Sequence, residues 1–153
     1  MERIKCSVRD VRDDDRSMLV LLAEETLHPL ADGSGHPELY RAADLLALLD
    51  RADVYVAEAD GETAGFLAVE AEGDALTLRC VCVGPAYEAR GVANQLVDWA
   101  EGLAIDRRLG RLTARVPEGD NPSLHLYRGH GFTTGPDPDS PGTLLVEKPL
   151  PVV

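Results

Sequence analysis

Hydrophobic and polar residues follow two different spacings along the chain, and together these predict a sheet interleaved with helices. Alternation with a period of two, or a short apolar run, predicts strands at residues 4–8, 54–58, 64–71, 76–83, 111–116 and 143–148, with a further strand beginning at residue 132. Helical spacing predicts helices at residues 14–27, 37–50, 91–107 and 122–129. This order predicts a mixed α/β or α+β fold, with a mostly antiparallel sheet of about six to seven strands and about four helices.

The run at residues 76–83 is expected to be the central strand. It is apolar on both faces apart from Thr77 and Arg79, which is typical of a strand buried on both sides. Residues 76–116 form a strand–helix–strand unit, so we expect a right-handed parallel crossover. Cys80 and Cys82 share one face of this strand and have no second Cys or His pair at ligand spacing. We therefore interpret them as buried apolar residues and expect no metal site.

Composition and charge restrict the partners. A chain of 153 residues suits one domain, residues 1–153, and the N-terminus lacks the long apolar core of a signal peptide, so we expect a cytoplasmic protein. A net charge of −12 makes nucleic acid and anionic membranes poor partners. Residues 1–75 carry −11 of this charge and residues 76–153 carry −1. The acidic half would favour a cationic partner such as an amine, although a solvated acidic surface is the alternative.

A turn rich in small residues follows the central strand. The strand breaks at Gly84-Pro85, and the chain then passes through residues 86–90 into the helix that begins near Gly91. The first N–H groups of a helix lack intrahelical partners, and with the helix dipole they bind phosphate well. Gly91 and Ala93 have little or no side chain, so a ligand could approach the backbone closely. The turn is therefore a candidate pyrophosphate site, although it could also be an ordinary strand–turn–helix junction.

A second motif lies downstream and changes this interpretation. Asn121 is followed by Leu126-Tyr127 and then by Gly131-Phe132, while the first motif comprises residues 81–85 and 88–93. The two motifs, with their separation and the order of elements, resemble those of the GNAT superfamily of acetyl-CoA-dependent N-acetyltransferases over nearly the whole chain. The resemblance implies a single GNAT-like domain with a splayed sheet, acetyl-CoA as co-substrate without a metal, and a primary amine as acceptor, either a small cationic molecule or a protein or peptide.

The resemblance also implies roles for individual residues. The pantetheine arm would lie along Val81, Cys82 and Val83. The pyrophosphate would bind the backbone N–H groups of Glu88, Ala89, Arg90, Gly91, Val92 and Ala93, with Asn121 as a further cofactor contact. A neutral amine would attack the thioester directly, and Tyr127 would protonate the departing thiolate as general acid. An unperturbed tyrosine has a pKa of about 10 and keeps its proton at neutral pH; the alternative role for Tyr127 is a core residue packed on the sheet.

Three positions depart from the family pattern. Glu88 stands where relatives usually have Arg or Gln, and a carboxylate beside a pyrophosphate is repulsive. Asn121 lies one residue closer to Tyr127 than in typical members, so we expect it to be the helix N-cap instead. Thr77 stands where several relatives have a glutamate base. Candidates for the base are Glu70, Glu25, His28 and His36, and water-mediated deprotonation is the alternative.

These departures leave other functions open. A catalytically weak, acyl-CoA-binding GNAT-like module is the main alternative, and a nucleotide-phosphate-binding protein that uses the same turn is the weaker one. We also expect residues 143–148 to form an exposed edge strand, which would allow a homodimer.

Overall fold

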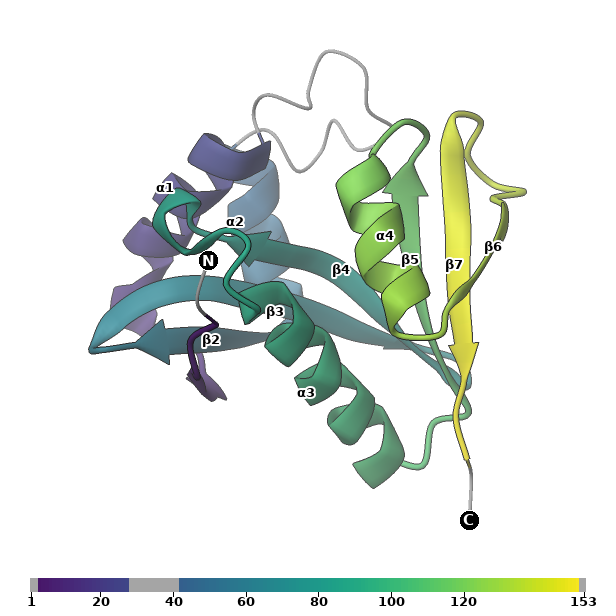
Figure 1. Ribbon diagram of the computed structural model, residues 1–153, viewed down its shortest axis with the longest axis horizontal. Helices are drawn as coiled ribbons and strands as arrows, with labels where there is room; N and C mark the ends of the chain where they lie inside the picture. Colours follow the sequence, from purple (N-terminus) through teal and green to yellow (C-terminus); the bar gives the residue numbers. More distant parts are fainter. Residues whose placement is uncertain (1–2, 28–41, 152–153) are drawn as a thin grey trace.

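The computed structural model describes residues 3–27 and 42–151 (Figure 1). The strands are β1 (Ser7–Asp10), β2 (Asp53–Ala59), β3 (Glu62–Glu72), β4 (Ala75–Val83), β5 (Arg111–Pro117), β6 (Thr133–Pro136) and β7 (Thr143–Pro149). The helices are α1 (Arg16–Leu27), α2 (Ala42–Arg51), α3 (Val92–Asp106) and α4 (Asn121–Gly129), with single 3₁₀ turns at η1 (Asp13–Asp15) and η4 (Pro85–Tyr87). This confirms the predicted mixed α/β class and the order of the elements, except that residues 4–6 precede the first strand and residues 37–41 lie outside the described part.

The strands form one sheet in the order β1-β2-β3-β4-β5-β7-β6, so β4 is the central strand, as predicted. Neighbours are antiparallel except for β4 and β5, which run parallel because α3 carries the chain back across the sheet. The prediction of an edge strand at residues 143–148 was wrong. The last strand, β7, inserts between β5 and β6, so β6 is the edge.

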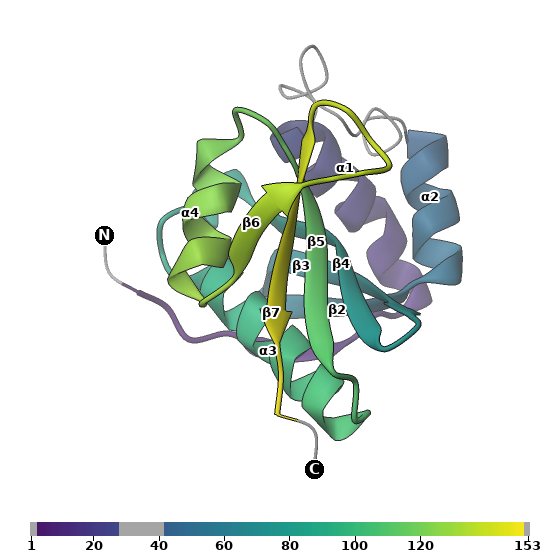
Figure 2. The same cartoon turned by 90° about the vertical axis from the view of Figure 1, so that its right-hand side faces the viewer.

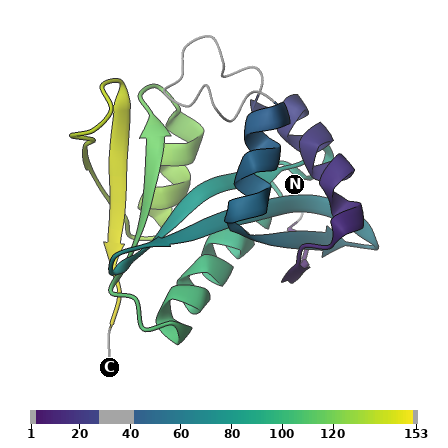
Figure 3. The same ribbon diagram turned by 180° about the vertical axis from the view of Figure 1, so that it is seen from behind.

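Helices cover both faces of the sheet (Figures 1 and 3). On one face, α3 and α4 pack on a core that includes Leu67, Leu76 and Leu96. On the other, α1 and α2 pack on a smaller core around Phe66, in which Cys80 and Cys82 are buried. Figure 2 views the sheet from the end formed by β6 and β7, with α4 and the pair α1–α2 on opposite sides. The burial of both cysteines confirms their interpretation as packing residues.

The central strand changes character halfway along. Its ladder with β5 ends at the pair Leu78 and Ala114, although β4 continues to Val83 and β5 to Pro117 (Figure 1). At the same level β4 has a bulge at Arg79, because Ala68 faces Cys80 while the next residue of β3, Val69, faces Leu78. A bulge bends its strand and increases the local twist. The strands β4 and β5 therefore diverge beyond Leu78, and we call the space between them the β4–β5 opening.

No helix in the described ranges is long and apolar enough to cross a membrane. Within the same ranges no group of three or more His, Cys, Asp or Glu side chains is arranged to hold a metal ion.

Candidate active site

The turn after β4 has the backbone of an anion-binding site. Ala89 and Gly91 both have left-handed backbone angles, with φ of 62° and 85°. Such conformations point successive N–H groups toward one side of the chain, as in anion-binding nests. Gly91 is the N-cap of α3 and supplies no side-chain acceptor to the first turn of the helix. The N-terminus of α3 therefore presents backbone donors and a positive dipole end to any ligand placed there.

The turn is fixed by contacts with the neighbouring hairpin. The N–H of Gly84 donates to the carbonyl of Ala64 at 2.8 Å, and the hydroxyl of Tyr87 donates to the Glu62 carboxylate at 2.7 Å. This bond to Glu62 is also the main reason why the pKa of Tyr87 is raised. Glu88 is exposed. Its extended backbone, with φ of −62° and ψ of 146°, leads directly into the left-handed Ala89, so the backbone rather than the carboxylate shapes the site.

The end of β4 supplies one wall of the opening. Val81 and Val83 are half-buried and pack toward the α3 side, whereas Cys82 is buried on the α1 side. On the other edge of β4, Gly65 lies so close that a Cβ at this position would collide with the Cys82 carbonyl oxygen. The pairing of β3 with β4 extends to Gly65 and Val83, so this edge holds the wall rigidly.

Tyr127 projects from α4 and is buried in the core beside Phe132, with ring centroids 5.0 Å apart. Burial raises the pKa of Tyr127 well above its ordinary value, and Cys80 and Asp120 raise it further. The core packing considered as the alternative role for Tyr127 is therefore observed, and its role as general acid stays a prediction.

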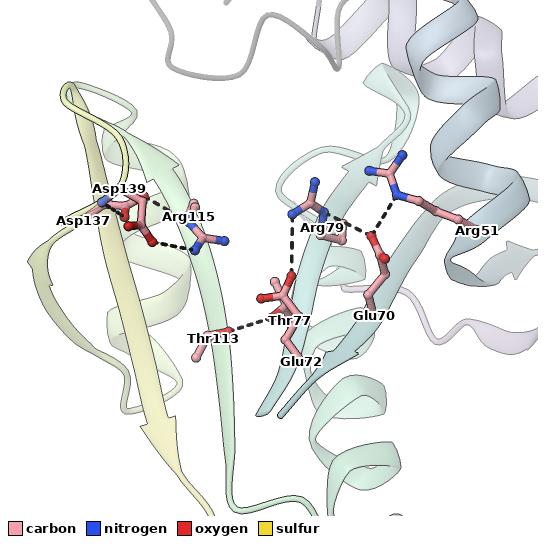
Figure 4. Close-up of polar contacts among 9 residues, drawn as sticks. All are labelled: Arg51, Glu70, Glu72, Thr77, Arg79, Thr113, Arg115, Asp137 and Asp139. Atoms are coloured by element: carbon pink, nitrogen blue, oxygen red, sulfur yellow. Dashed lines mark hydrogen bonds and ion pairs between the residues drawn. The ribbon is translucent and has the colours of Figure 1, made fainter. Parts of the chain in front are cut away.

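At the base of the opening, the hydroxyls of Thr77 and Thr113 are 2.9 Å apart and hydrogen-bonded (Figure 4). Both side chains are buried, and they occupy the pair of positions just before the ladder ends. A threonine hydroxyl is not a base at neutral pH, so this position supplies none. Of the other candidate bases, His28 and His36 lie outside the described residues, as does the side chain of Glu25.

Glu70 is the described candidate base, and it is held between two arginines. Arg51 of α2 and Arg79 of β4 lie 3.2 and 3.4 Å from the same Glu70 oxygen, and Arg79 also lies 3.9 Å from Glu72 (Figure 4). The Glu70 side chain is about a quarter exposed. These charges form a half-exposed ionic cluster on the β3–β4 side of the opening, between the sheet and α2.

A second ionic cluster lies across the opening, on β5. Arg115 donates from Nε to the fully buried carboxylate of Asp137 at 3.0 Å, and Asp139 lies 3.9 Å away (Figure 4). Burial alone would raise the pKa of Asp137, but hydrogen bonds from the Asp139 backbone and the Thr143 hydroxyl, with Arg115, lower it below its ordinary value. Charged side chains from β3, β4 and β5 thus flank the opening on both sides.

The prediction that Asn121 caps α4 was wrong. The N-cap is Asp120, whose carboxylate accepts hydrogen bonds from the Ser123 N–H at 3.2 Å and from the Ser123 hydroxyl at 2.6 Å. Asn121 is the first residue of the helix and is exposed. Aspartate and asparagine cap equally well, so the hydrogen bond that forms, rather than residue preference, decided between them.

Sequence reasoning also missed Gln95, which connects the turn at residues 84–91, the candidate phosphate turn, to the N-terminal segment. Its carboxamide donates to the carbonyls of Ile4 at 2.6 Å and Gly91 at 3.2 Å, and accepts from the Cys6 N–H at 2.8 Å. The available signal was a polar residue beside the apolar stripe of α3. Its partners, 89 and 91 residues away, could not be predicted.

Known proteins similar to this chain are acetyltransferases. The profile of the acetyltransferase (GNAT) family matches residues 16–132. A streptothricin acetyltransferase from Streptomyces lavendulae is 36% identical over 76 residues, which are 48% of this chain and 40% of that protein. The chain thus spans about two fifths of the length of this relative.

Solved structures share the fold. The PaiA N-acetyltransferase from Thermoplasma acidophilum, solved in complex with coenzyme A, superposes with a TM-score of 0.81 at 17% identity, covering 96% of this chain and all of that one. The ribosomal-protein-S18-alanine N-acetyltransferase from Escherichia coli has a TM-score of 0.78 at 15% identity, covering 97% of this chain and 96% of that one. A nourseothricin acetyltransferase is 28% identical, with a TM-score of 0.58 over 65% of this chain and 66% of that one.

Proposed function

The chain belongs to the acetyltransferase (GNAT) family, and on this basis we propose that it transfers an acetyl group from acetyl-CoA to a primary amine. One observation carries the proposal: β4 and β5 diverge beyond Leu78, and the open end of β4 leads directly into the turn that begins α3. A pantetheine arm would lie along Val81, Cys82 and Val83 like an added strand. The N–H groups of residues 88–93 would then bind the pyrophosphate, and Asn121 would be a further contact.

The chemistry proposed for the opening needs few side chains. The nitrogen of a neutral amine attacks the thioester carbonyl, a backbone N–H near Val83 stabilises the oxyanion, and the carbon–sulfur bond then breaks. Tyr127 gives its proton to the departing thiolate. Burial raises the pKa of Tyr127, so the phenol holds a proton to give at neutral pH, but the same shift makes it a weaker acid than an ordinary tyrosine. The proton lost by the amine passes to Glu70 or to water.

We propose a cationic acceptor, either a small molecule or an amine of a protein or peptide. The acidic excess of residues 1–75 supports it, as does Glu70, which lies level with Thr77 at the base of the opening. Two relatives named for acetyl transfer to streptothricin and to nourseothricin support the transfer reaction.

Thiol release tests the reaction. The protein is incubated with acetyl-CoA and a panel of polyamines, amino sugars, lysine derivatives and peptides, and free CoA thiol is measured over time. Thiol release that depends on the acceptor supports the enzyme, and the best acceptor identifies the substrate class. Binding of CoA without turnover on any amine favours the alternative of a catalytically weak acyl-CoA-binding module. The hydrogen-bonded Thr77 at the usual position of the base favours that alternative.

We also propose a cytoplasmic location, supported by the three free cysteines, which suit a reducing compartment. A homodimer would have to associate through the edges β1 or β6 or through a helical face, because β7 is paired on both sides. Light scattering of the purified protein at several concentrations tests for the dimer.

A further inference from the structure

The segment that precedes β1 lies against the phosphate turn. The N–H of Ile4 donates to the Arg90 carbonyl at 3.0 Å. Ile4 also packs against the core beneath α3. The first described residues of the chain are therefore attached to the same backbone that is proposed to bind the pyrophosphate, although this segment belongs to neither motif.

Gln95 fixes this attachment. One side-chain carboxamide binds both sides of the junction, because it meets Ile4 and Cys6 on the segment and Gly91 on the turn. The side chain is half-buried, where a carboxamide that lost its partners would be costly. The distance between segment and turn is thus set by three side-chain hydrogen bonds and one backbone hydrogen bond.

Arg3 completes the contact. Its stem lies over Gly91, with Cγ, Cδ and Cβ 3.6, 3.7 and 3.9 Å from the position that a Cβ of Gly91 would occupy. The side chain is exposed, and no carboxylate of the described residues forms an ion pair with it. An arginine stem that packs on the N-cap of α3 keeps a guanidinium, a planar donor suited to phosphate, within reach of the same anion as the helix N-terminus.

We propose that residues 3–6 form one wall of the coenzyme site, with Arg3 as a contact to the diphosphate and Gln95 as the residue that positions the segment. The inference rests on the proposed binding of acetyl-CoA. It explains how a site with Glu88 in place of a cationic or neutral residue could still hold a diphosphate, since Arg3 supplies a positive charge from outside the motif.

Calorimetry with CoA tests the contact, using the protein with an untagged N-terminus. Arg3→Gln is expected to weaken binding by about three- to tenfold, and to make it less sensitive to salt, because an exposed charged contact is lost. Arg3→Lys keeps the charge but loses the planar pair of donors, so it should weaken binding less than Arg3→Gln does. The matched control is Arg108→Gln, which removes the same charge beyond the opposite end of α3 and should leave the affinity unchanged.

The outcomes separate the two proposals. A wild-type protein that does not bind CoA overturns both. Wild-type binding with an unchanged affinity in Arg3→Gln overturns the role of Arg3 alone, and an equal loss in Arg108→Gln assigns the effect to net charge and overturns it as well.

A double-mutant cycle tests the positioning role of Gln95. Gln95→Leu keeps the volume but removes the hydrogen bonds to the segment, so the KM for acetyl-CoA should rise while kcat is retained. In the Gln95→Leu background, Arg3→Gln should cost less than about twofold, because the segment is already displaced. Circular dichroism and thermal unfolding establish that the variants fold. Additive losses, or a fall in kcat with an unchanged KM, would overturn the positioning role.

Discussion

Two regions around the β4–β5 opening are built in different ways. The region proposed to bind the coenzyme, which we call the coenzyme side, lies at the end of β4 and the turn after it. It is made of backbone: two left-handed residues, a helix N-terminus without a side-chain cap, and a strand held by its neighbour. The region proposed to bind the acceptor, which we call the acceptor side, is made of charged side chains from α2 and from β3, β4 and β5. A backbone site tolerates changes of side chain, such as Glu88, whereas a site made of ion pairs changes its preference with each substitution. Apart from Arg3 and Gln95, we therefore expect side-chain substitutions on the coenzyme side to change CoA binding little, and substitutions on the acceptor side to alter acceptor choice.

We expect the largest loss of turnover from a substitution at Tyr127. Tyr127→Phe removes only the hydroxyl, so the fold should be kept while kcat falls by about 10²- to 10³-fold. Burial raises the pKa of Tyr127, so its acid form persists above its ordinary titration range. The loss should accordingly be the same from about pH 6 to about pH 9.

The matched control for this variant is Tyr55→Phe. Tyr55 is also buried, its hydroxyl accepts from Arg107 at 3.3 Å, and its ring contacts Trp99 rather than the opening. Thiol release should be nearly unchanged in this variant. A Tyr127→Phe protein that keeps wild-type turnover would remove the general acid from the mechanism.

Two glycines, Gly91 at the N-cap of α3 and Gly102 within the helix, test how far the coenzyme side depends on backbone conformation. Gly91→Ala places a side chain in the left-handed region, with its Cβ at ordinary contact distance from the Arg3 stem, so it should cost about 1 kcal/mol of unfolding free energy and weaken CoA binding by about tenfold. Gly102→Ala lies in the middle of the helix with no atom within 4 Å of the new Cβ, so it should stabilise the protein by about 0.5–1 kcal/mol.

Chemical denaturation and calorimetry measure both changes. The same Gly→Ala substitution should therefore destabilise the protein at Gly91 and stabilise it at Gly102. A Gly91→Ala protein that binds CoA like the wild type would show that the left-handed turn is not the phosphate site.

Glu70→Gln tests the acceptor side. It removes the carboxylate that Arg51 and Arg79 share, so kcat/KM for a cationic amine should fall by about fivefold, while the KM for acetyl-CoA stays constant. Steady-state kinetics with each substrate varied in turn separates the two constants. A rise in the KM for acetyl-CoA instead would show that the two sides are not independent.

The smallest effect is expected at Glu88. Its carboxylate is exposed and screened, so Glu88→Gln should tighten CoA binding by only about twofold. Unchanged or weaker affinity in calorimetry would show that the carboxylate does not repel the pyrophosphate.

Features that follow from local sequence patterns could be predicted, and features that depend on distant pairing could not. The turn at residues 84–91 and the central position of β4 were predictable because both follow from local patterns: small residues after an apolar strand, and a helix that returns the chain. The insertion of β7 between β5 and β6 was not, since strand order depends on pairing between segments far apart in the sequence.

Two kinds of feature in the candidate site could not be predicted: which of two neighbouring residues caps a helix, and which residues far apart in the sequence bond to one another. Asp120 and Asn121 are equally good caps, and only the geometry of Ser123 distinguishes them. The bonds of Gln95 to the N-terminal segment and the ion pair of Arg115 with buried Asp137 join residues that no sequence spacing relates. Side-chain contacts between residues far apart in the sequence were thus the least predictable part of the candidate site.

Hydrogen–deuterium exchange with and without CoA tests the central claim, that one continuous stretch from the end of β4 to the start of α3 binds the coenzyme. We expect slower exchange at residues 79–83 and at residues 88–93 when CoA is added, with β1, β2 and the far end of α3 unchanged. Binding of CoA that leaves both stretches unprotected, or that protects a different surface, would contradict it.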